Sequence, residues 1–564
     1  MRSSPLAGFV SGAVDFQIRF GSFLRRLVGF FMEFECQERA EVSIVGEGLS
    51  NQGAELRIGD GSVEVPCVKL CYQQKKSTLV VPSDKDLSTT THRYTIIDLP
   101  QALISEILNC LDPKELGLVS CVSTCLHRLA SEHHAWKGFY CERWGLPVVF
   151  GGKTSEERSW KELFIEREFR SKTFLGRHSI DTLYGHTEAV RTVFLLASAK
   201  LIFTSGYDCV VRMWGMEEGL SIAASKPLGC TIRAVAADTK LLVAGGTDGF
   251  IHCWKAVDGL TDLFDLTGFQ KEKTKFRLWE HEGPITSLAL DMTSIFSGSW
   301  DMSVRIWDRS SFKCIKTLRH SDWVWGLAPH ETSIACAAGS DVYIWDISSE
   351  TPEAIIHDAH EGNTYSLARS HSGDFLFTGG EDGGIKMFEI RKHGNETSVV
   401  LISQWMPHTG PVYSLSFEFP WLVSASGDGK LALIDVRKLL KTNRRGLPKR
   451  VSSRIVEPPQ RMLHGFGSNL FSVDVGCDRI VCGGEEGVVR IWNFTQALEI
   501  ERRARALKGM RLENRMRRRR TQMEMNAKSG RPDQCSIAAH KNPVNGDRKR
   551  VWHTKRRASG KAKA

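Results

Sequence analysis

The stretch GHTEAVRTVFLLASAKLIFTSGYDCVVRMW, residues 185–214, decides the fold. It begins with a His near a turn, continues through a Val-rich strand and a small-residue strand that ends in Asp, and closes on a strand that ends in Trp. Short apolar runs bounded by turn residues are typical of β-strands. The same order of features recurs seven times between Leu183 and Phe494. Such a period indicates an architecture assembled from copies of one small unit.

In six of the seven copies an acidic residue precedes the closing Trp, Phe or Ile by six positions. The pairs are Asp208/Trp214, Asp248/Trp254, Asp301/Trp307, Asp382/Phe388, Asp428/Ile434 and Glu486/Trp492. The other copy has Asp341 only four positions before Trp345, which predicts a shortened turn. Because one short meander cannot bury both of its faces, the copies are expected to pack against one another in a ring.

The pattern resembles the WD-repeat family, which implies a mainly β fold, a seven-bladed β-propeller over residues 176–496. In that family a hydrogen-bonded chain of His, Ser or Thr, Asp and Trp fixes each turn. The resemblance implies two complete chains, His186/Thr204/Asp208/Trp214 and His281/Ser297/Asp301/Trp307. A catalytic triad occurs once, whereas this set recurs around a ring, so we interpret it as structural. The family also implies that residues 180–183 complete the blade that contains residues 488–494.

A small all-α segment is predicted ahead of the ring, over residues 95–144. Its first apolar residues follow one helical stripe: Leu103, Ile104, Ile107, Leu108 and Leu111. Asp112-Pro113-Lys114-Glu115 is close to a capping box and predicts the start of a second helix. So short a bundle buries too little apolar surface to be stable alone, and a partner is expected to complete its core.

This segment resembles an F-box in Leu99-Pro100, Ile107-Leu108, Leu111-Asp112-Pro113 and Trp136, although Ala102 replaces a commonly acidic residue. The resemblance implies a Skp-type adaptor as partner, and through it a cullin/RING ligase core. It assigns adaptor binding to Leu99, Pro100, Leu103, Ile107, Leu108, Leu111 and Pro113. The alternative is a helical subdomain that packs on the propeller.

WD-repeat substrate receptors bind the degradation signal on one face of the ring, so the resemblance also implies binding residues there. They are Arg191, Tyr207, Arg233, Trp300, Trp325, Tyr365, Tyr413 and Phe471. The arginines, in one sector beside Tyr207, suit phosphate or carboxylate, and the aromatic residues are of types that dominate binding energies. For about a third of the aromatic residues, the alternative is that they plug the channel mouth. Receptors of this family that read phosphorylated signals use a larger arginine cluster, so two arginines do not decide whether the signal is phosphorylated.

Charge is unevenly distributed along the chain. Residues 501–564 contain 21 Lys and Arg against 5 Asp and Glu, which leaves 54 basic and 60 acidic residues elsewhere. The net charge of +10 therefore arises from a basic tail, predicted over residues 497–564 as disordered with a helix-prone stretch at 502–520. The basic runs favour nuclear import, with RNA or DNA contact through the tail as the alternative. The expected localisation is nucleus and cytoplasm.

Residues 1–94 are expected to form a largely irregular extension, and residues 145–175 a helical linker. Residues 16–34 suit an amphipathic targeting sequence, and the alternative is that residues 1–31 are an extension ahead of a second start at Met32. No apolar stretch is long enough to span a membrane, so no membrane partner is expected. The 15 Cys are scattered without the spacing of a zinc site, so neither a metal nor a cofactor is expected.

Taken together, these features predict a non-catalytic, substrate-recognition subunit of an SCF-type E3 ubiquitin ligase that captures an unknown protein substrate. The alternative is a nuclear WD-repeat scaffold for ribonucleoprotein or chromatin complexes, in which the helical segment is a relic. An enzyme is a third hypothesis, but the sequence has no Gly-rich phosphate loop, nucleophile motif or metal set.

Overall fold

The structure, a computed structural model, describes residues 99–146, 159–257, 263–268, 274–394, 396–437, 439, 460–464, 467–476 and 478–528. The expected N-terminal extension, with its two interpretations, lies outside the described residues. The chain divides into two compact units, Met1–Phe494 and Thr495–Ala564. No helix in the described ranges has the length and apolar character needed to cross a bilayer.

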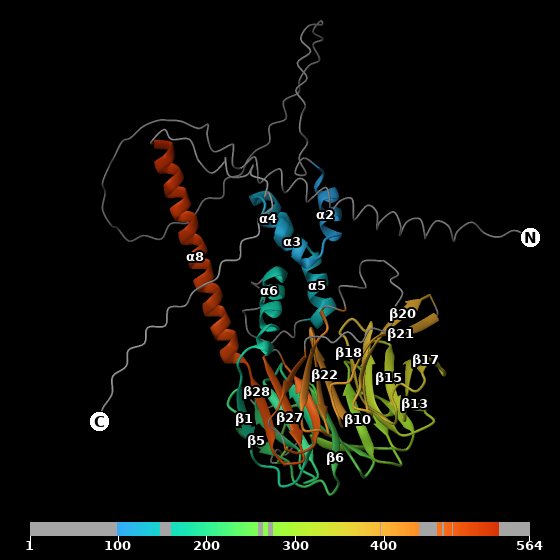
Figure 1. The fold of residues 1–564 in the computed structure, drawn as a ribbon. Helices are drawn as coiled ribbons and strands as arrows, with labels where there is room; N and C mark the ends of the chain where they lie inside the picture. The colour runs from blue at the N-terminus through green and yellow to red at the C-terminus, as the bar shows by residue number, and fades with distance from the viewer. Residues whose placement is uncertain are drawn as a thin grey trace, which may run out of the picture. The chain divides into compact units, whose positions relative to one another are not determined.

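The first unit contains seven four-stranded antiparallel sheets, here called blades 1 to 7 (Figure 1). Blades 1 to 3 consist of β2 (Val190–Leu196), β3 (Leu201–Gly206), β4 (Arg212–Gly215), β5 (Ser221–Ala224); β6 (Ile232–Ala237), β7 (Leu241–Gly246), β8 (Phe250–Lys255), β9 (Lys275–Trp279); and β10 (Ile285–Leu290), β11 (Ser294–Ser299), β12 (Ser303–Asp308), β13 (Cys314–Arg319). Blades 4 and 5 consist of β14 (Val324–His330), β15 (Ser333–Ala338), β16 (Asp341–Asp346), β17 (Pro352–Ile356); and β18 (Thr364–Arg369), β19 (Phe375–Gly380), β20 (Ile385–His393), β21 (Glu396–Trp405). Blades 6 and 7 consist of β22 (Val412–Glu418), β23 (Trp421–Ser426), β24 (Leu431–Asp435), β25 (Gln460–Leu463); and β26 (Leu470–Val475), β27 (Arg479–Gly484), β28 (Val489–Asn493), β1 (Ser179–Leu183).

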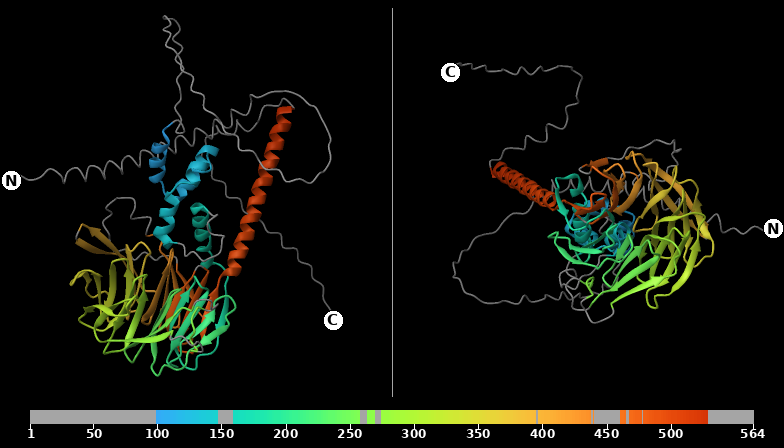
Figure 2. Two further views of the ribbon diagram at one scale, coloured as in Figure 1. Left: turned by 180° about the vertical axis from the view of Figure 1, so that it is seen from behind. Right: turned by 90° about the horizontal axis from the view of Figure 1, so that it is seen from below.

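The ring closes because blade 7 takes strands from both ends of the repeat region. β1 pairs antiparallel with β28, with Ile180 opposite Trp492 and Leu183 opposite Val489. The innermost strands of neighbouring blades contact one another in a closed cycle, and Figure 2 shows the sheets arranged around a common axis. Closure leaves no open edge between the first and last repeats. The predicted seven-bladed propeller and its closing strand are both confirmed.

Apolar side chains fill the space between blades, which is why each copy of the repeat needs its neighbours. The second strand is buried at every position in β3, β7, β15, β23 and β27. Phe296 and Val304 of blade 3 share one apolar cluster with Ile334 of blade 4. Full burial of such a side chain stabilises the fold by about 1.5–3 kcal/mol.

The shortened turn predicted in the fourth copy is confirmed. Ala338 pairs directly with Asp341, so Gly339 and Ser340 alone connect β15 to β16. Gly339 has φ +58, a left-handed conformation that a two-residue hairpin requires and glycine adopts without steric cost.

The predicted F-box segment is helical, with a core of its own. It contains α2 (Gln101–Asn109), α3 (Pro113–Val119), α4 (Thr124–Ser131) and α5 (Ala135–Trp144). The predicted capping box begins α3, because the Asp112 carboxylate accepts from the backbone N–H groups of Lys114 and Glu115, each at 2.8 Å. In return, the Asp112 N–H donates to the Glu115 carboxylate at 3.0 Å. Leu116, Trp136 and other apolar side chains form the core.

A second capping box, between Ser159 and Glu162, begins α6 (Trp160–Arg170), which connects the helical segment to blade 6. Trp144 Nε1 donates to the Phe419 carbonyl at 2.8 Å. The Arg143 guanidinium lies 4.9 Å from the ring centroids of both Phe164 and Phe419. These contacts fix the helical segment against the end of β22 and the start of β23.

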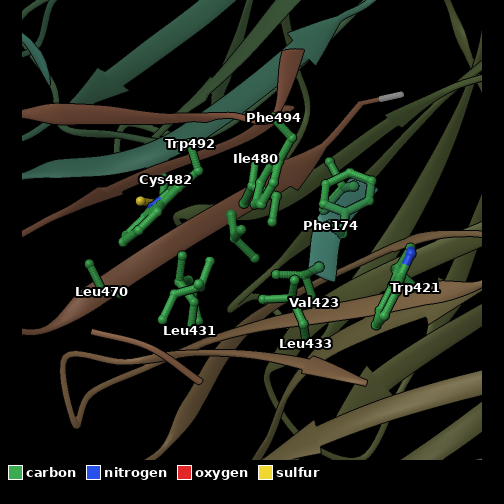
Figure 3. Packing of buried hydrophobic residues seen from close by; sticks show 14 residues of the cluster. Phe174, Trp421, Val423, Leu431, Leu433, Leu470, Ile480, Cys482, Trp492 and Phe494 are labelled. Carbon is green, nitrogen blue, oxygen red and sulfur yellow. The ribbon is translucent and has the colours of Figure 1, made fainter. Parts of the chain in front are cut away.

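The 3₁₀ helix η3 (Thr173–Leu175) continues this junction into the propeller core. Figure 3 shows the Phe174 ring near Trp421 and Phe494, with centroid distances of 6.1 and 4.9 Å. The Trp421 indole N–H donates to the Ser171 carbonyl. A buried aromatic cluster therefore couples the linker to blades 6 and 7.

The second unit contains one helix, α8 (Thr495–Lys528), among its described residues. The disordered tail expected from residue 497 onward is therefore corrected for this range, since the helix extends well beyond the helix-prone stretch at 502–520. The physical reason is composition, because Ala, Leu, Met, Glu and Arg are strong helix formers, and Gly509 and Asn514 are the weak ones in its centre. Residues 529–564 lie outside the described residues.

Candidate functional site

Hydrogen-bonded chains fix the turns that precede the third strand in blades 1 and 3. In blade 1 the His186 imidazole is 2.6 Å from Asp208 and 2.8 Å from the Thr204 hydroxyl, which accepts from Trp214 Nε1 at 2.8 Å. The corresponding distances in blade 3 are 2.6, 2.7 and 2.9 Å among His281, Asp301, Ser297 and Trp307. These groups bond one another inside the blades, which suits a structural role.

Blades 5 and 6 keep three of the four groups. His360 is 3.0 Å from Asp382 and 2.7 Å from Thr378. The equivalent three groups in blade 6 are His408, Asp428 and Ser424. Phe388 and Ile434 take the closing positions and have no N–H to donate. Burial lowers the pKa of His360 and of His408.

Blade 2 departs from this pattern and brings together three side chains of metal-ligating type. Cys230 Sγ is 3.7 Å from His252 Nε2, which is 3.5 Å from the Asp248 carboxylate. No other such group of three occurs among the described residues. Burial raises the pKa of the Cys230 thiol to about 12 and lowers that of His252 to about 4. Both shifts favour the uncharged forms, a protonated thiol and a neutral imidazole.

The innermost strands begin around a cavity of about 190 Å³. Its wall includes the second residue of every innermost strand, a set called the mouth below: Arg191, Arg233, Thr286, Trp325, Tyr365, Tyr413 and Phe471. Six of these seven were predicted binding residues. The mouth lies at the end of the central channel where the His and Asp turns are found.

Aromatic rings form an unbroken arc from blade 3 to blade 7. Trp300 contacts Trp325 with a centroid distance of 5.6 Å, and Trp325 contacts Tyr365 at 4.9 Å. Tyr413 continues the arc, 5.5 Å from Tyr365 and 5.6 Å from Phe471. The arc forms because the ring brings equivalent positions of consecutive inner strands side by side. Its large flat rings offer apolar contact area to a ligand.

Two arginines close the arc through blades 1 and 2. The Arg191 guanidinium lies 4.6 Å from the Phe471 centroid, and that of Arg233 lies 4.5 Å from Trp300. Burial lowers the pKa of both, that of Arg233 to about 10 with repulsion by Arg191 as the second cause. Neither guanidinium forms an ion pair with a carboxylate in the described part of the chain. The mouth thus carries two desolvated positive charges that lack a counter-ion there.

The charged and apolar parts of the mouth adjoin. The contact between Arg233 and Trp300 joins the two parts. Tyr207 lies in the turn before β4 and is 46% exposed. Its interaction with Arg191 and Arg233 raises their pKa, against the larger effect of burial. Tyr207 lies outside the cavity wall, as does Trp300.

Sequence reasoning missed Trp323, which stacks on Trp300 with a centroid distance of 5.2 Å. A second Trp two positions before Trp325 was the available signal. The indole N–H groups of Trp300 and Trp325 and the Ser287 hydroxyl are buried without a hydrogen-bond partner in the described structure. Unsatisfied buried donors are costly, so a bound acceptor would stabilise this region.

The predicted adaptor-binding residues differ in exposure. Leu99, Pro100 and Leu103 are exposed, Ile107 and Pro113 are half-buried, and Leu108 and Leu111 are buried. Leu108 and Leu111 belong to the core of the helical segment, and their role in adaptor binding stays a prediction. Their stripe is shared between core and surface, because α2 turns one side towards α3 to α5. Sequence reasoning missed Leu118, which is 59% exposed.

One strand, β22, contributes to the mouth at its start and to the junction with α6 at its end. Tyr413, near the start of β22, belongs to the mouth, while Glu418, at its end, forms an ion pair with Arg167 of α6. Five steps of about 3.3 Å separate these residues by roughly 16 Å. The mouth and the junction with the helical segment therefore lie at opposite ends of β22.

Comparisons with known proteins match both parts of the chain. Residues 96–142 match the F-box-like family, and residues 177–215, 272–308, 312–346, 352–389 and 400–435 match the family described as WD domain, G-beta repeat. The inner strands of blades 2 and 7 fall outside these matches.

A relative named F-box/WD-40 repeat-containing protein, from Arabidopsis thaliana, is 83% identical over 546 residues, which cover 94% of this chain and 100% of that protein. Pre-mRNA-processing factor 19 of Bos taurus is 26% identical over 187 residues, 32% of this chain and 33% of that protein. A solved structure, the WD40 beta propeller domain of Doa1, has a TM-score of 0.45 at 20% identity and covers 56% of this chain and 97% of that chain. The full-length likeness to the Arabidopsis protein, together with both domain matches, shows that the chain belongs to the F-box/WD-repeat family.

Proposed function

We propose that this chain is the substrate-recognition subunit of an SCF-type E3 ubiquitin ligase. The observation that carries the proposal is the mouth, where two buried guanidinium groups without a counter-ion in the described chain adjoin an arc of aromatic rings. Such a surface attracts a peptide that pairs an acidic or phosphorylated group with a bulky apolar one.

The helical segment supplies the other half of the proposal. Leu99, Leu103 and Leu118 are 40%, 52% and 59% exposed on a small bundle, and a partner that covers these apolar side chains would stabilise it. A Skp-type adaptor is the partner that the F-box match supports. In this scheme the chain performs no catalysis, and the adaptor links it to a cullin/RING core that supplies the ligase activity. The captured protein is then ubiquitinated and degraded by the proteasome.

Replacing Leu99 and Pro100 together by Ala is expected to lower adaptor affinity at least about tenfold, since few residues dominate such an interface. Both residues are exposed, so the core of the helical segment is left intact. Co-purification with a Skp-type adaptor measures the effect. The matched control is Met292→Ala, an 88% exposed apolar residue on the propeller that should not change adaptor recovery.

Undiminished adaptor recovery with the double variant would rule out the receptor proposal and favour the WD-repeat scaffold, which has no need of Leu99 and Pro100. Proteins that accumulate with the intact chain after proteasome inhibition, but are ubiquitinated less with the double variant, would identify substrates.

We also propose that the chain works in the nucleus and the cytoplasm, because its basic clusters suit nuclear import. Deleting residues 501–564 removes these clusters but keeps the buried Ala497 and Leu498. A fluorescent fusion of the truncated chain is expected to shift towards the cytoplasm while the propeller keeps its melting temperature. An unchanged nuclear fraction would contradict this proposal.

A further inference from the structure

The helix α8 has a charged segment that the receptor function does not use. Residues 502–520 contain nine Arg and one Lys against a single Glu, Glu513. At about 1.5 Å per residue, these 19 residues extend for roughly 28 Å. All of them except the half-buried Ala504 are exposed.

The positive charge lies on all sides of α8. Because successive helical residues are rotated by about 100°, the run Arg517–Arg520 alone points in four directions. The exposed apolar residues form no common stripe, since Leu507 lies on nearly the opposite side from Leu512 and Met516. A helix that lies on a membrane or in a protein groove needs one apolar stripe. α8 therefore suits a partner that surrounds it with negative charge.

Much of this charge is not neutralised within the described chain. Arg503 pairs with Glu499 at 2.8 Å, and Arg517 pairs with Glu513 at 2.9 Å. No ion pair within the described residues is formed by Arg511, Arg515, Arg518, Arg519 or Arg520. Arg511, Arg515 and Arg519 follow one another at four-residue intervals, a spacing at which like charges oppose helix formation. An anionic partner would remove this repulsion.

We propose that α8 binds duplex DNA in the major groove, an activity beyond the proposed receptor function. The groove is about 12 Å wide and admits a helix about 10–12 Å in diameter. Phosphates border the groove on both sides, which matches a helix that is basic all round. Arginine also binds phosphate through two parallel hydrogen bonds, which lysine cannot do. An A-form RNA duplex has a major groove too deep and narrow for this contact.

The test uses the full-length protein and fluorescence anisotropy with a labelled DNA duplex of two to three turns, across a series of salt concentrations. Replacing Arg511, Arg515, Arg518, Arg519 and Arg520 by Gln is expected to weaken binding at low salt about a hundredfold or more. If all five arginines contact phosphates, it should also reduce the slope of log affinity against log salt by about 4.5, since each lost phosphate contact removes roughly 0.9. Unchanged affinity or slope would overturn the proposal.

Two further variants separate the helix from its charge. Gly509→Pro keeps every charge but interrupts the helix, and it is expected to lower affinity at least about tenfold. The triple variant Leu507→Gln, Leu512→Gln and Met516→Gln keeps both helix and charge and should bind as the wild type does. If the Gly509→Pro variant bound the duplex as tightly as the wild type, or if the triple variant bound it much more weakly, the proposal that α8 binds as a charged helix in the groove would be overturned.

Competing polyanions complete the test. An RNA duplex and single-stranded DNA of the same length should bind more weakly than the DNA duplex at equal salt. Vesicles that contain phosphatidylserine should fail to displace the duplex. Equal or stronger binding of any of these three probes would overturn the major-groove assignment.

Discussion

Replacing both Arg191 and Arg233 by Glu is expected to abolish capture of the substrate signal, with a loss of affinity of at least about a hundredfold. Removing one member of a buried, hydrogen-bonded charge pair costs about 2–5 kcal/mol, and about 1.4 kcal/mol corresponds to a tenfold change. Charge reversal adds repulsion to that loss. Adaptor binding should be unaffected, because the helical segment contacts the other end of β22.

Peptide arrays provide the measurement, with acidic, phosphorylated and neutral sequences that each carry a bulky apolar residue. Arg191→Gln with Arg233→Gln is the companion variant, which removes the charge without reversing it and should give a smaller loss. The charge-matched control is Lys240→Glu with Lys313→Glu, two exposed lysines in connections at the opposite ends of blades 2 and 3. Loss of capture in the lysine variant, with retention in the arginine variant, would place recognition on the opposite face.

The mouth could be predicted from the sequence because the repeat fixes which residue of each innermost strand starts the channel. Asp208 and Trp214 fix how the repeat pattern aligns with blade 1, and this alignment makes Arg191 the second residue of the innermost strand. The same reasoning places Arg233 second in the innermost strand of blade 2. The contact between Arg233 and Trp300 could not be predicted, because it depends on the direction of two long side chains from different blades. Trp323 was missed because it lies in a connection, where the repeat imposes no side-chain direction.

The helical regions show where sequence patterns were insufficient. Spacings of three and four predicted the stripe on α2, but not which of its residues face the core of the bundle. Leu108 is buried and Leu103 exposed, although both belong to that stripe. In α8, strong helix formers outweighed the repulsion between basic residues, which composition alone had suggested would prevent order. In blade 2, Ala244 stands where blade 1 has Thr204 and offers no hydroxyl, and the buried His252 lies beside Cys230 instead.

Mild acid is expected to destabilise the propeller, because several buried histidines are neutral in the folded state. Burial lowers the pKa of His252 and of His320 to about 4, and it also lowers those of His360 and His408. In the unfolded chain a histidine has a pKa of about 6.5. Below pH 6.5 the unfolded chain therefore binds more protons than the folded one, and stability falls as the pH decreases towards 4.

The expected loss of folding free energy in mild acid is large for a domain of ordinary stability. His252 is fully buried, and holding it neutral at pH 5 costs about 2 kcal/mol relative to the unfolded chain. The aspartates in the turns affect stability in a separate, lower pH range. Burial raises the pKa of Asp208 and Asp428, but the interactions with their paired histidines and with backbone N–H groups lower it more, so their contribution is lost only as the pH falls below about 4. Urea unfolding at pH 7, 6 and 5 should show a steady decrease in the midpoint.

His320 offers the decisive variant. Its Nε2 accepts from Trp345 Nε1 at 3.1 Å, so protonation at that atom would remove the acceptor and leave a buried indole N–H unsatisfied. His320→Gln keeps an acceptor but cannot be protonated in this range, and it should reduce the dependence of the midpoint on pH. His357→Gln is the control, because the His357 side chain is 71% exposed and its replacement should leave that dependence unchanged. A midpoint that stays constant from pH 7 to pH 5 in the wild type would contradict the buried, neutral state of these histidines.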